Sequence, residues 1–360
     1  MTDQQQPTKV VSDFEATLDK ADKKVASFDT KDAGLLQRLR SVLHSNPTVI
    51  PIVVLVASVL IFSLAAGERF LTPGNMSLVL QQVTVIGIIA IAQTMIILTA
   101  GIDLSVGAIM ALSSIVMGKL AVQTGLPVPV AIFLGLCSGG LMGFVNGTLV
   151  TYMKLPPFIA TLGTLNIYQS LKLFYSHSES IRNSDIEKQA PGLLWFGDSF
   201  QFLGASVTYG GVALILLAIL AWYALNWTAW GRYVHAVGDD PDSAMLAGIR
   251  TGRTLVSVYT VAGIICAFAA WVLIGRVGSV TPLAGETANL DSITAVVIGG
   301  TSLFGGRGSI VGSVLGALIV GVFRNGLSLA GVEVLWQDFT VGILIILAVA
   351  IDQWLRRASK

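Results

Sequence analysis

The side chains that could do chemistry are few in this sequence and lie apart from one another. Its three histidines, His44, His177 and His235, belong to no metal-binding or nucleophile–base motif. The sequence contains no phosphate-binding GxxxxGK(S/T) loop, no HExxH pair, no GxSxG turn and no pair of cysteines at zinc-binding spacing. We therefore expect a chain that is not an enzyme and that holds no metal or cofactor of its own.

Three ionisable side chains stand inside apolar stretches, where they could couple transport to protons or sodium ions: Asp103, Asp291 and Arg324. Asp103 follows a Gly–Ile break and Asp291 begins a stretch, so we expect both to cap helices. Arg324 lies near one end of its stretch, where it can reach outward to water or pair with a polar group. Because embedded acids are so few, an ion-coupled transporter is the less favoured class.

Uncharged polar side chains in the apolar stretches suit a neutral polyhydroxylated solute, to which amides and hydroxyls offer hydrogen bonds without charge. Hydrogen bonding between helices is the alternative role of each of these residues. The predicted substrate path consists of Gln82, Gln93, Asp103, Asn146, Thr161, Thr164 and Asn166.

One polar segment, residues 230–253, lies between long apolar stretches. Asp240 suits the N-cap of a helix, and Pro241 suits its first position, where no N–H is needed. With Gly252 as the closing residue, these residues predict a short helix over 241–251. The helix is either an ordinary surface loop between membrane helices or a docking element for a soluble partner.

Composition indicates a polytopic membrane protein. The chain has 360 residues, of which 54% are hydrophobic and 12% charged, and its mean hydropathy is +0.76. The net charge of +1 argues against a nucleic-acid partner. The first apolar stretch begins near residue 48, so the sequence predicts no cleavable signal peptide, and the first membrane helix must direct insertion.

Crossing the hydrocarbon layer takes about 20 apolar residues, and ten stretches approach that length. The predicted fold is all-α, with about ten transmembrane helices, some of them broken or re-entrant. The stretches are 48–66, 76–98, 103–123, 127–151, 158–176, 208–227, 254–275, 290–304, 309–330 and 336–354.

The distribution of Lys and Arg places both termini in the cytosol. This orientation makes 228–253 a cytosolic loop and 177–207 a long outer loop of a membrane domain over residues 47–355. Residues 1–46 form a hydrophilic cytosolic extension, whose apolar stripe predicts a helix on the membrane surface or an arm that contacts a partner. Residues 356–360 form a cytosolic tail.

Two segments are similar to each other: residues 97–118 and residues 297–321. Each consists of a helix end, a Gly-rich break and a helix rich in small residues. Internal repeats and broken helices are common in transporters, although a chance likeness is the alternative. The predicted topology puts both breaks on the same side of the membrane.

Two runs carry a resemblance to a known family: FLTPGNMSLVLQQVTVIGIIAIAQTMIILTAGIDLSVGAIMALSS and AVVIGGTSLFGGRGSIVGSVLGALIVG. They resemble the permease subunits of bacterial ABC sugar importers of the ribose, xylose and fructose type, in the branched-chain permease superfamily. The resemblance spans residues 48–353. It implies a multi-pass inner-membrane protein that pairs as a homodimer. It also implies a cytosolic ATPase subunit that uses ATP and Mg²⁺, a periplasmic binding protein that delivers a monosaccharide, and transport through the permease by alternating access.

In this family the segment matching residues 238–249 resembles the element that couples the permease to the ATPase. Asp240 and Ser243 depart from the usual Gly-x-Asn-Pro-x-Ala-Ala pattern, which leaves the identity of the ATPase open. An ion-coupled secondary transporter of a neutral solute is the alternative function, and a channel-like facilitator is less favoured. The expected coupling residues are Gly238, Asp240, Pro241, Ala244, Met245, Leu246, Gly248 and Ile249.

Overall fold

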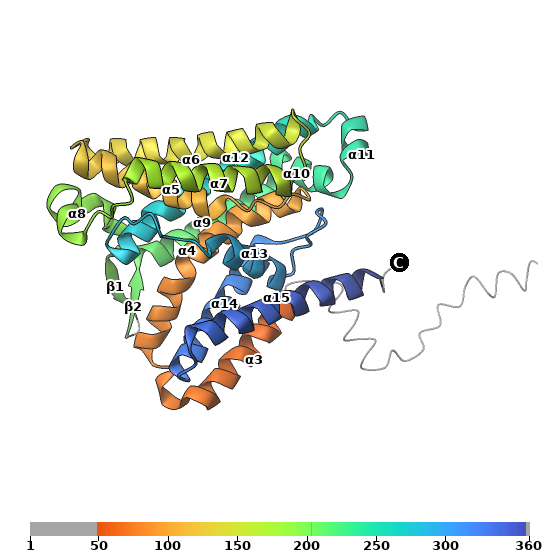
Figure 1. Ribbon diagram of the computed structural model, residues 1–360. Helices are drawn as coiled ribbons and strands as arrows, with labels where there is room; N and C mark the ends of the chain where they lie inside the picture. Colours follow the sequence, from red (N-terminus) through yellow and green to blue (C-terminus); the bar gives the residue numbers. More distant parts are fainter. Residues whose placement is uncertain (1–48, 203, 358–360) are drawn as a thin grey trace, which may run out of the picture. The chain divides into compact units, whose positions relative to one another are not determined.

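The computed structural model describes residues 49–202 and 204–357, all of which belong to one compact unit. The predicted extension, residues 1–46, lies outside the described residues, as do residues 358–360 of the predicted tail. Helices dominate the described part (Figure 1), which confirms the predicted class of a polytopic helical membrane protein.

Seven of the described helices are long and apolar enough to cross a membrane. They are α3 (Val49–Ala66), α4 (Pro73–Leu98), α5 (Val106–Gly118) with its π-helical extension η2 (Lys119–Gln123), α6 (Val128–Thr151), α9 (Tyr209–Trp227), α12 (Thr251–Val277) and α14 (Ile310–Leu329). The remaining predicted stretches contain α7 (Pro157–Ser176), α13 (Ala288–Ile298) and α15 (Val334–Arg357). A helix thus lies in each predicted stretch, but ten membrane-crossing helices are not established.

Several of these helices begin at a side chain that satisfies the first turn. The Thr72 hydroxyl accepts a hydrogen bond from the Asn75 backbone N–H at 3.3 Å, just before α4. The Ser309 hydroxyl accepts one from the Gly312 backbone N–H at 3.0 Å, just before α14. These caps replace the hydrogen bonds that the first N–H groups of a helix lack, so local sequence determines where the helices begin.

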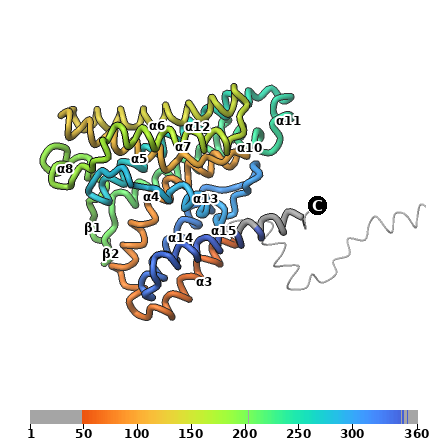
Figure 2. Tube along the Cα trace, viewed as in Figure 1, coloured from red at the N-terminus to blue at the C-terminus, as the bar shows by residue number. Residues whose placement is uncertain are grey.

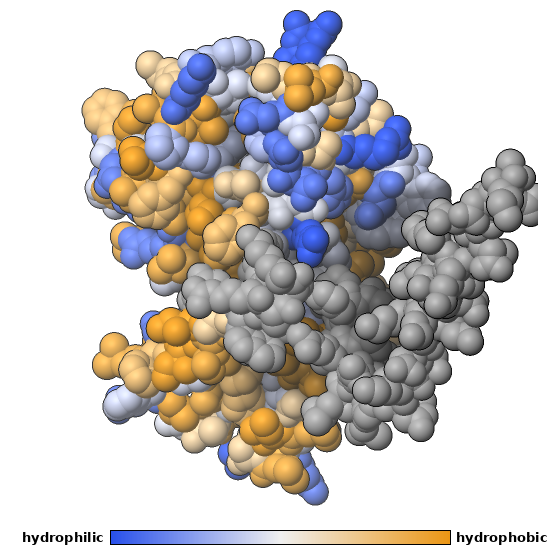
Figure 3. Space-filling view, turned by 90° about the vertical axis from the view of Figure 1, so that its right-hand side faces the viewer, coloured by the Kyte–Doolittle hydropathy of each residue, from blue (hydrophilic) through white to orange (hydrophobic). Residues whose placement is uncertain are grey.

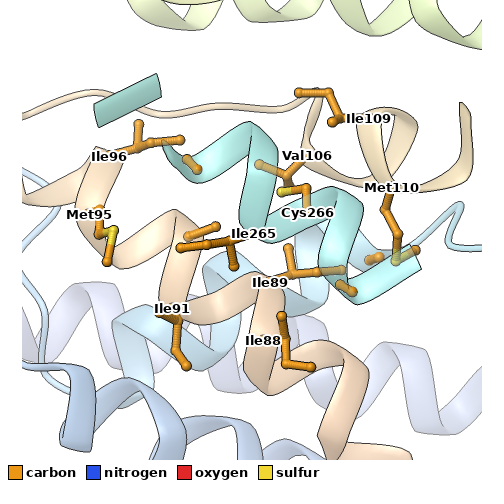
Figure 4. Packing of buried hydrophobic residues seen from close by; sticks show 14 of the residues in the cluster. Ile88, Ile89, Ile91, Met95, Ile96, Val106, Ile109, Met110, Ile265 and Cys266 are labelled. Atoms are coloured by element: carbon orange, nitrogen blue, oxygen red, sulfur yellow. The ribbon is translucent and has the colours of Figure 1, made fainter. Parts of the chain in front are cut away.

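The main hydrophobic core lies between α4, α5 and α12 (Figure 4). Ile88 and Ile96 of α4, Ile109 of α5 and Cys266 of α12 are each at most 1% exposed. Both α4 and α12 are therefore interior helices, whereas α3 and α9 have mostly exposed apolar faces, as expected of helices that face lipid.

Glycines bring α6 and α12 into direct backbone contact. A Cβ atom on Gly143 would lie 2.1 Å from the Tyr259 carbonyl oxygen, and one on Gly139 would lie 2.5 Å from the Gly263 carbonyl oxygen. No larger residue fits at either glycine without separating the helices. Close approach through small residues is typical of helix packing in membranes.

The loop after α7, which the sequence predicts on the outer side, folds into short elements. They are α8 (Asn183–Gln189), η3 (Pro191–Leu193), η4 (Trp195–Gly197), and the antiparallel strands β1 (Ser199–Phe202) and β2 (Ala205–Thr208). This two-stranded ribbon is an addition to the helical prediction. The loop contacts the end of α12, where a Cβ atom on Gly197 would lie 2.0 Å from the Gly275 carbonyl oxygen. Figure 1 shows α8, β1 and β2 at the opposite end of the unit from α11 (Pro241–Leu246).

Non-helical breaks follow α4 and α13, at residues 99–105 and 299–309. The backbone N–H of Gly306 donates to the carbonyl oxygen of Leu98 at 3.0 Å, so the two breaks touch. Figure 2 shows the blue loop between α13 and α14 extending towards α10 (Ala229–Asp239). The similar segments are therefore similar in structure as well, with their breaks on the same side.

Candidate transport and coupling sites

The polar segment between α9 and α12 forms two helices, α10 and α11. The Asp240 carboxylate caps α11, because its Oδ1 accepts hydrogen bonds from the backbone N–H groups of Asp242 at 3.0 Å and Ser243 at 3.2 Å. The Ser243 hydroxyl donates to Oδ2 at 2.6 Å, and this bond is the main cause that lowers the pKa of Asp240. The predicted N-cap is confirmed, with Pro241 at the first helical position.

The predicted end of this helix at residue 251 is wrong, because α11 ends at Leu246. Gly248 adopts a left-handed backbone with φ of +84°. The Ile249 N–H donates to the Ala244 carbonyl at 3.0 Å, and the Gly248 N–H donates to the Met245 carbonyl at 3.0 Å. This Schellman arrangement closes the helix at the first available glycine, and Gly252 lies inside α12 instead.

The apolar side chains of α11 point away from the rest of the described chain. Met245 is 60% exposed and Leu246 is 88% exposed, while Ala244 is buried at 4%. Figure 3, a view onto the end that carries α10 and α11, shows hydrophilic residues over the upper part of this face with hydrophobic residues among them. Met245 and Leu246 are therefore available for contact with another protein.

The C-terminal end of α10 packs directly on both membrane breaks. A Cβ atom on Gly238 would lie 1.7 Å from the Leu98 carbonyl oxygen and 2.9 Å from the Gly306 nitrogen. The ring of His235 approaches the Gly306 carbonyl oxygen at 3.3 Å. Gly238 is buried at this contact, which we call the coupling junction, so it positions α10 and does not itself face a partner.

Asp103 lies in the break after α4 and is 1% exposed. Its Oδ1 accepts hydrogen bonds from the Ser105 backbone N–H at 2.6 Å and from the Ser105 hydroxyl at 2.7 Å. Its Oδ2 accepts one from the Asn146 side-chain amide at 3.0 Å. The expected helix cap is wrong, because the N-cap of α5 is Ser105. Asp103 instead ties the break to α6.

Helix α7 joins the same polar cluster. The Thr161 hydroxyl accepts a hydrogen bond from the Leu104 N–H at 3.2 Å and donates to the Ile102 carbonyl oxygen at 3.1 Å. The Tyr168 hydroxyl donates to the Asn146 Oδ1 atom at 3.2 Å. The structure therefore brings Asp103, Asn146 and Thr161 together, and it shows them holding the break between α6 and α7.

The other predicted path residues lie elsewhere. Gln93 is fully buried in α4, and neither atom of its amide has a hydrogen-bond partner in the described chain. Gln82 is half-buried, and Thr164 is buried with its hydroxyl bonded to the Thr161 carbonyl oxygen. Asn166 is exposed and donates to the Leu162 carbonyl oxygen. None of the predicted path residues lines the best-formed cavities of the described residues.

Asp291 is not the helix cap that the sequence predicts. It lies in the first turn of α13 and pairs with Arg324 of α14, with 2.7 Å between the Arg324 Nη2 and Asp291 Oδ1 atoms. Thr287 also donates to its Oδ2 atom at 3.1 Å, and Arg324 further reaches Asp338 at 3.4 Å. An ion pair between helices satisfies both charges where water is scarce, and the expected polar partner of Arg324 is thereby identified.

Lys172 is an embedded charge that the sequence reasoning missed. It lies in α7 and is 4% exposed. It lines a small cavity with Gln169 of the same helix and with Glu286 and Asn289, which belong to the loop before α13 and to α13 itself. Its position within an apolar stretch could have revealed it, because ionisable residues inside membrane segments usually have a functional role.

Comparison with known proteins agrees with this architecture. Residues 75–349 match the family model described as branched-chain amino acid transport system / permease component. The chain is 54% identical to the fructose import permease protein of Rhizobium meliloti over 96% of both chains. It is 40% identical to the ribose import permease protein of Bacillus subtilis, covering 84% of this chain and 90% of the relative. It is also 36% identical to the D-allose transport system permease protein of Escherichia coli, covering 83% and 90%.

The apolar helices, the membrane breaks and these relatives define a multi-pass inner-membrane permease. The chain belongs to the family of branched-chain-type transport-system permease components. It is therefore a permease component of a transport system.

Proposed function

We propose that this chain forms the translocation path of an ATP-driven importer for a monosaccharide. D-Fructose is the first sugar to test, because the relative named for fructose import is 54% identical over 96% of this chain. Ribose and xylose are the next candidates, since a relative named for ribose import is 40% identical. Amide and hydroxyl groups embedded among apolar helices fit a neutral, hydroxylated substrate.

The observation that supports ATP as the energy source is the exposed helix α11, on the end of the permease that we expect to face the cytosol. Its apolar tip, Met245 and Leu246, is presented to solvent beside the capped turn that Asp240 and Gly248 fix. We infer that a cytosolic ATPase subunit, which binds ATP and Mg²⁺, docks on this tip. Closure of an ATPase dimer would push α11, and α10 would carry the push to the coupling junction.

Two copies of the chain and a periplasmic sugar-binding protein complete the proposed importer. The sugar-loaded binding protein would contact the outer segments 67–75, 177–207, 276–289 and 331–335. It can shift the permease between inward-open and outward-open states only by binding one state more tightly than the other. We expect the pair of permease subunits to be a homodimer.

Reconstitution in lipid vesicles tests the proposal. With the ATPase and the fructose-loaded binding protein present, we expect D-fructose uptake that requires ATP. Uptake that needs neither partner and follows a proton or sodium gradient would refute this function in favour of an ion-coupled carrier. The tight pairing of Asp291 with Arg324 supports the ATP-driven alternative, since it leaves that acid engaged.

A further inference from the structure

A polar cavity lies where three membrane segments meet. It is bounded by the start of α5, by the face of α7 that carries Leu165, Gln169 and Lys172, and by residues 285–289 at the start of α13. It contains about 200 Å³ of unfilled space, including its open mouth, but only about 10 Å³ admits the centre of a water molecule. The cavity is therefore constricted in this conformation.

Lys172 is the most unusual residue of this cavity. It is 4% exposed, and in the described part of the chain no carboxylate lies within ion-pair distance of its ammonium group. Glu286 lines the same cavity but forms no ion pair with Lys172 in the described residues. Lys119 provides a contrast, because its ammonium group donates to the Tyr175 carbonyl oxygen at 2.6 Å. A lysine that is largely buried among apolar helices and has no ion-pair partner favours an acceptor from outside the chain.

Asn289 supplies a second group without a partner. Its side-chain nitrogen donates to the Leu104 carbonyl oxygen at 3.2 Å, in the break after α4. Its Oδ1 atom is buried and accepts no hydrogen bond in the described chain. A buried acceptor left unpaired is rare in proteins and requires an explanation. Donor and acceptor thus face the same small space from different helices.

The cluster around Asp103 offers no free hydrogen-bonding group to a ligand. Both of its carboxylate oxygens already accept hydrogen bonds from Ser105 and Asn146. The cavity, by contrast, is lined by Lys172, by the amide of Gln169 and by Asn289, whose Oδ1 atom accepts no hydrogen bond in the described chain. Alternating donors and acceptors without a matched charge pair are what a hydroxylated neutral ligand requires.

We propose that this cavity is a contact site for the transported monosaccharide, with Lys172 donating to a sugar oxygen and Asn289 Oδ1 accepting from a sugar hydroxyl. The inference rests on the proposed function and names the residues that serve it. The constriction arises where the backbones of Gly107 and Gly285 meet, since a Cβ atom on Gly107 would lie 2.8 Å from the Gly285 carbonyl oxygen. Moving residues 284–289 away from α5 would enlarge the cavity towards the outer side.

The experiment uses the full importer in vesicles, with saturating fructose-loaded binding protein as the sugar source. The variants are Lys172→Met, Gln169→Leu and Asn289→Leu, each of which replaces a polar side chain by an apolar one. We expect D-fructose transported per ATP hydrolysed to fall at least ten-fold in Lys172→Met and by a smaller factor in the other two. Ser170→Ala is the control, because this exposed hydroxyl lies on the same helix but outside the cavity, and the variant should transport normally.

The outcomes separate the two claims. If the unaltered importer takes up neither D-fructose nor D-ribose with ATP, the proposed function fails. If it transports sugar but all three cavity variants keep the normal ratio of transport to hydrolysis, the cavity assignment fails. If Lys172→Met does not insert, Gln169→Leu and Asn289→Leu decide the question, because a loss in both together with a normal Ser170→Ala supports the site.

Discussion

Replacing Gly238 with alanine tests whether the coupling junction positions α10. The new Cβ atom would lie 1.7 Å from the Leu98 carbonyl oxygen, whereas ordinary contacts of a Cβ atom begin at 3.4 Å. Since the obstacle is backbone on both sides, no side chain can rotate away. The end of α10, and α11 with it, must therefore move away from the breaks until this distance grows from 1.7 Å to about 3.4 Å.

The free energy involved is moderate. Overpacking a tight contact by one methyl group costs about 1–3 kcal/mol, which is smaller than the total stability of a typical folded domain, about 5–15 kcal/mol. The permease should therefore still fold. If the same strain opposes the position of α11 that the ATPase requires, affinity for the ATPase should fall by about 5- to 150-fold.

The assay titrates purified ATPase subunit onto the permease in lipid discs and measures both binding and sugar-stimulated ATP hydrolysis. Gly163→Ala is the matched control, because a Cβ atom on Gly163 meets no atom within 4 Å. We expect Gly163→Ala to bind normally and Gly238→Ala to bind weakly. Equal affinity and equal stimulation in the two variants would refute the idea that the junction positions α11.

Three further changes probe α11 and the embedded ion pair. Leu246→Ser should alter stability by no more than about 0.5 kcal/mol, since the side chain is exposed, but should weaken ATPase binding by about ten-fold or more; unchanged binding would exclude Leu246 from the contact. Gly248→Trp should abolish transport and stimulated ATP hydrolysis while insertion stays intact, because it forces a bulky residue into a left-handed turn at the docking tip; normal stimulation would contradict the docking role. Arg324→Met should lower the free energy of unfolding by about 3–5 kcal/mol, because Asp291 would keep a buried and unpaired charge, and adding Asp291→Asn should restore part of the loss in a thermal unfolding assay.

Local sequence predicted the features that depend on neighbours in the chain. Apolar length located the helices, and the Asp-Pro pair located the cap of α11, because a cap needs only groups within three residues. The end of α11 was misplaced because Gly248 and Gly252 are equally able to close a helix. Only the packing of Gly252 inside α12, against Thr151 of α6, distinguishes them.

Features made by distant segments could not be read from the sequence. The Asp291–Arg324 pair joins two helices, so Asp291 alone resembled an ordinary cap. Gly238 resembled a contact residue, although the Leu98 carbonyl oxygen occupies the space beside it. Lys172 was overlooked because its importance depends on the loop before α13, which the sequence places far away. The β1–β2 ribbon is short, and its residues gave no alternating pattern long enough to predict strands.

The glycine contacts of α12 have a mechanical consequence. Helix α12 begins directly after the turn at Gly248 and extends for 27 residues, which is about 40 Å at 1.5 Å per residue. Its backbone touches α6 at Gly139 and Gly143, and its far end touches the outer loop at Gly197. Because no flexible side chain separates the backbones at these points, α12 and α6 would move as one rigid body. A displacement of α11 would then reach the loop at Gly197 through the backbone contacts of α12.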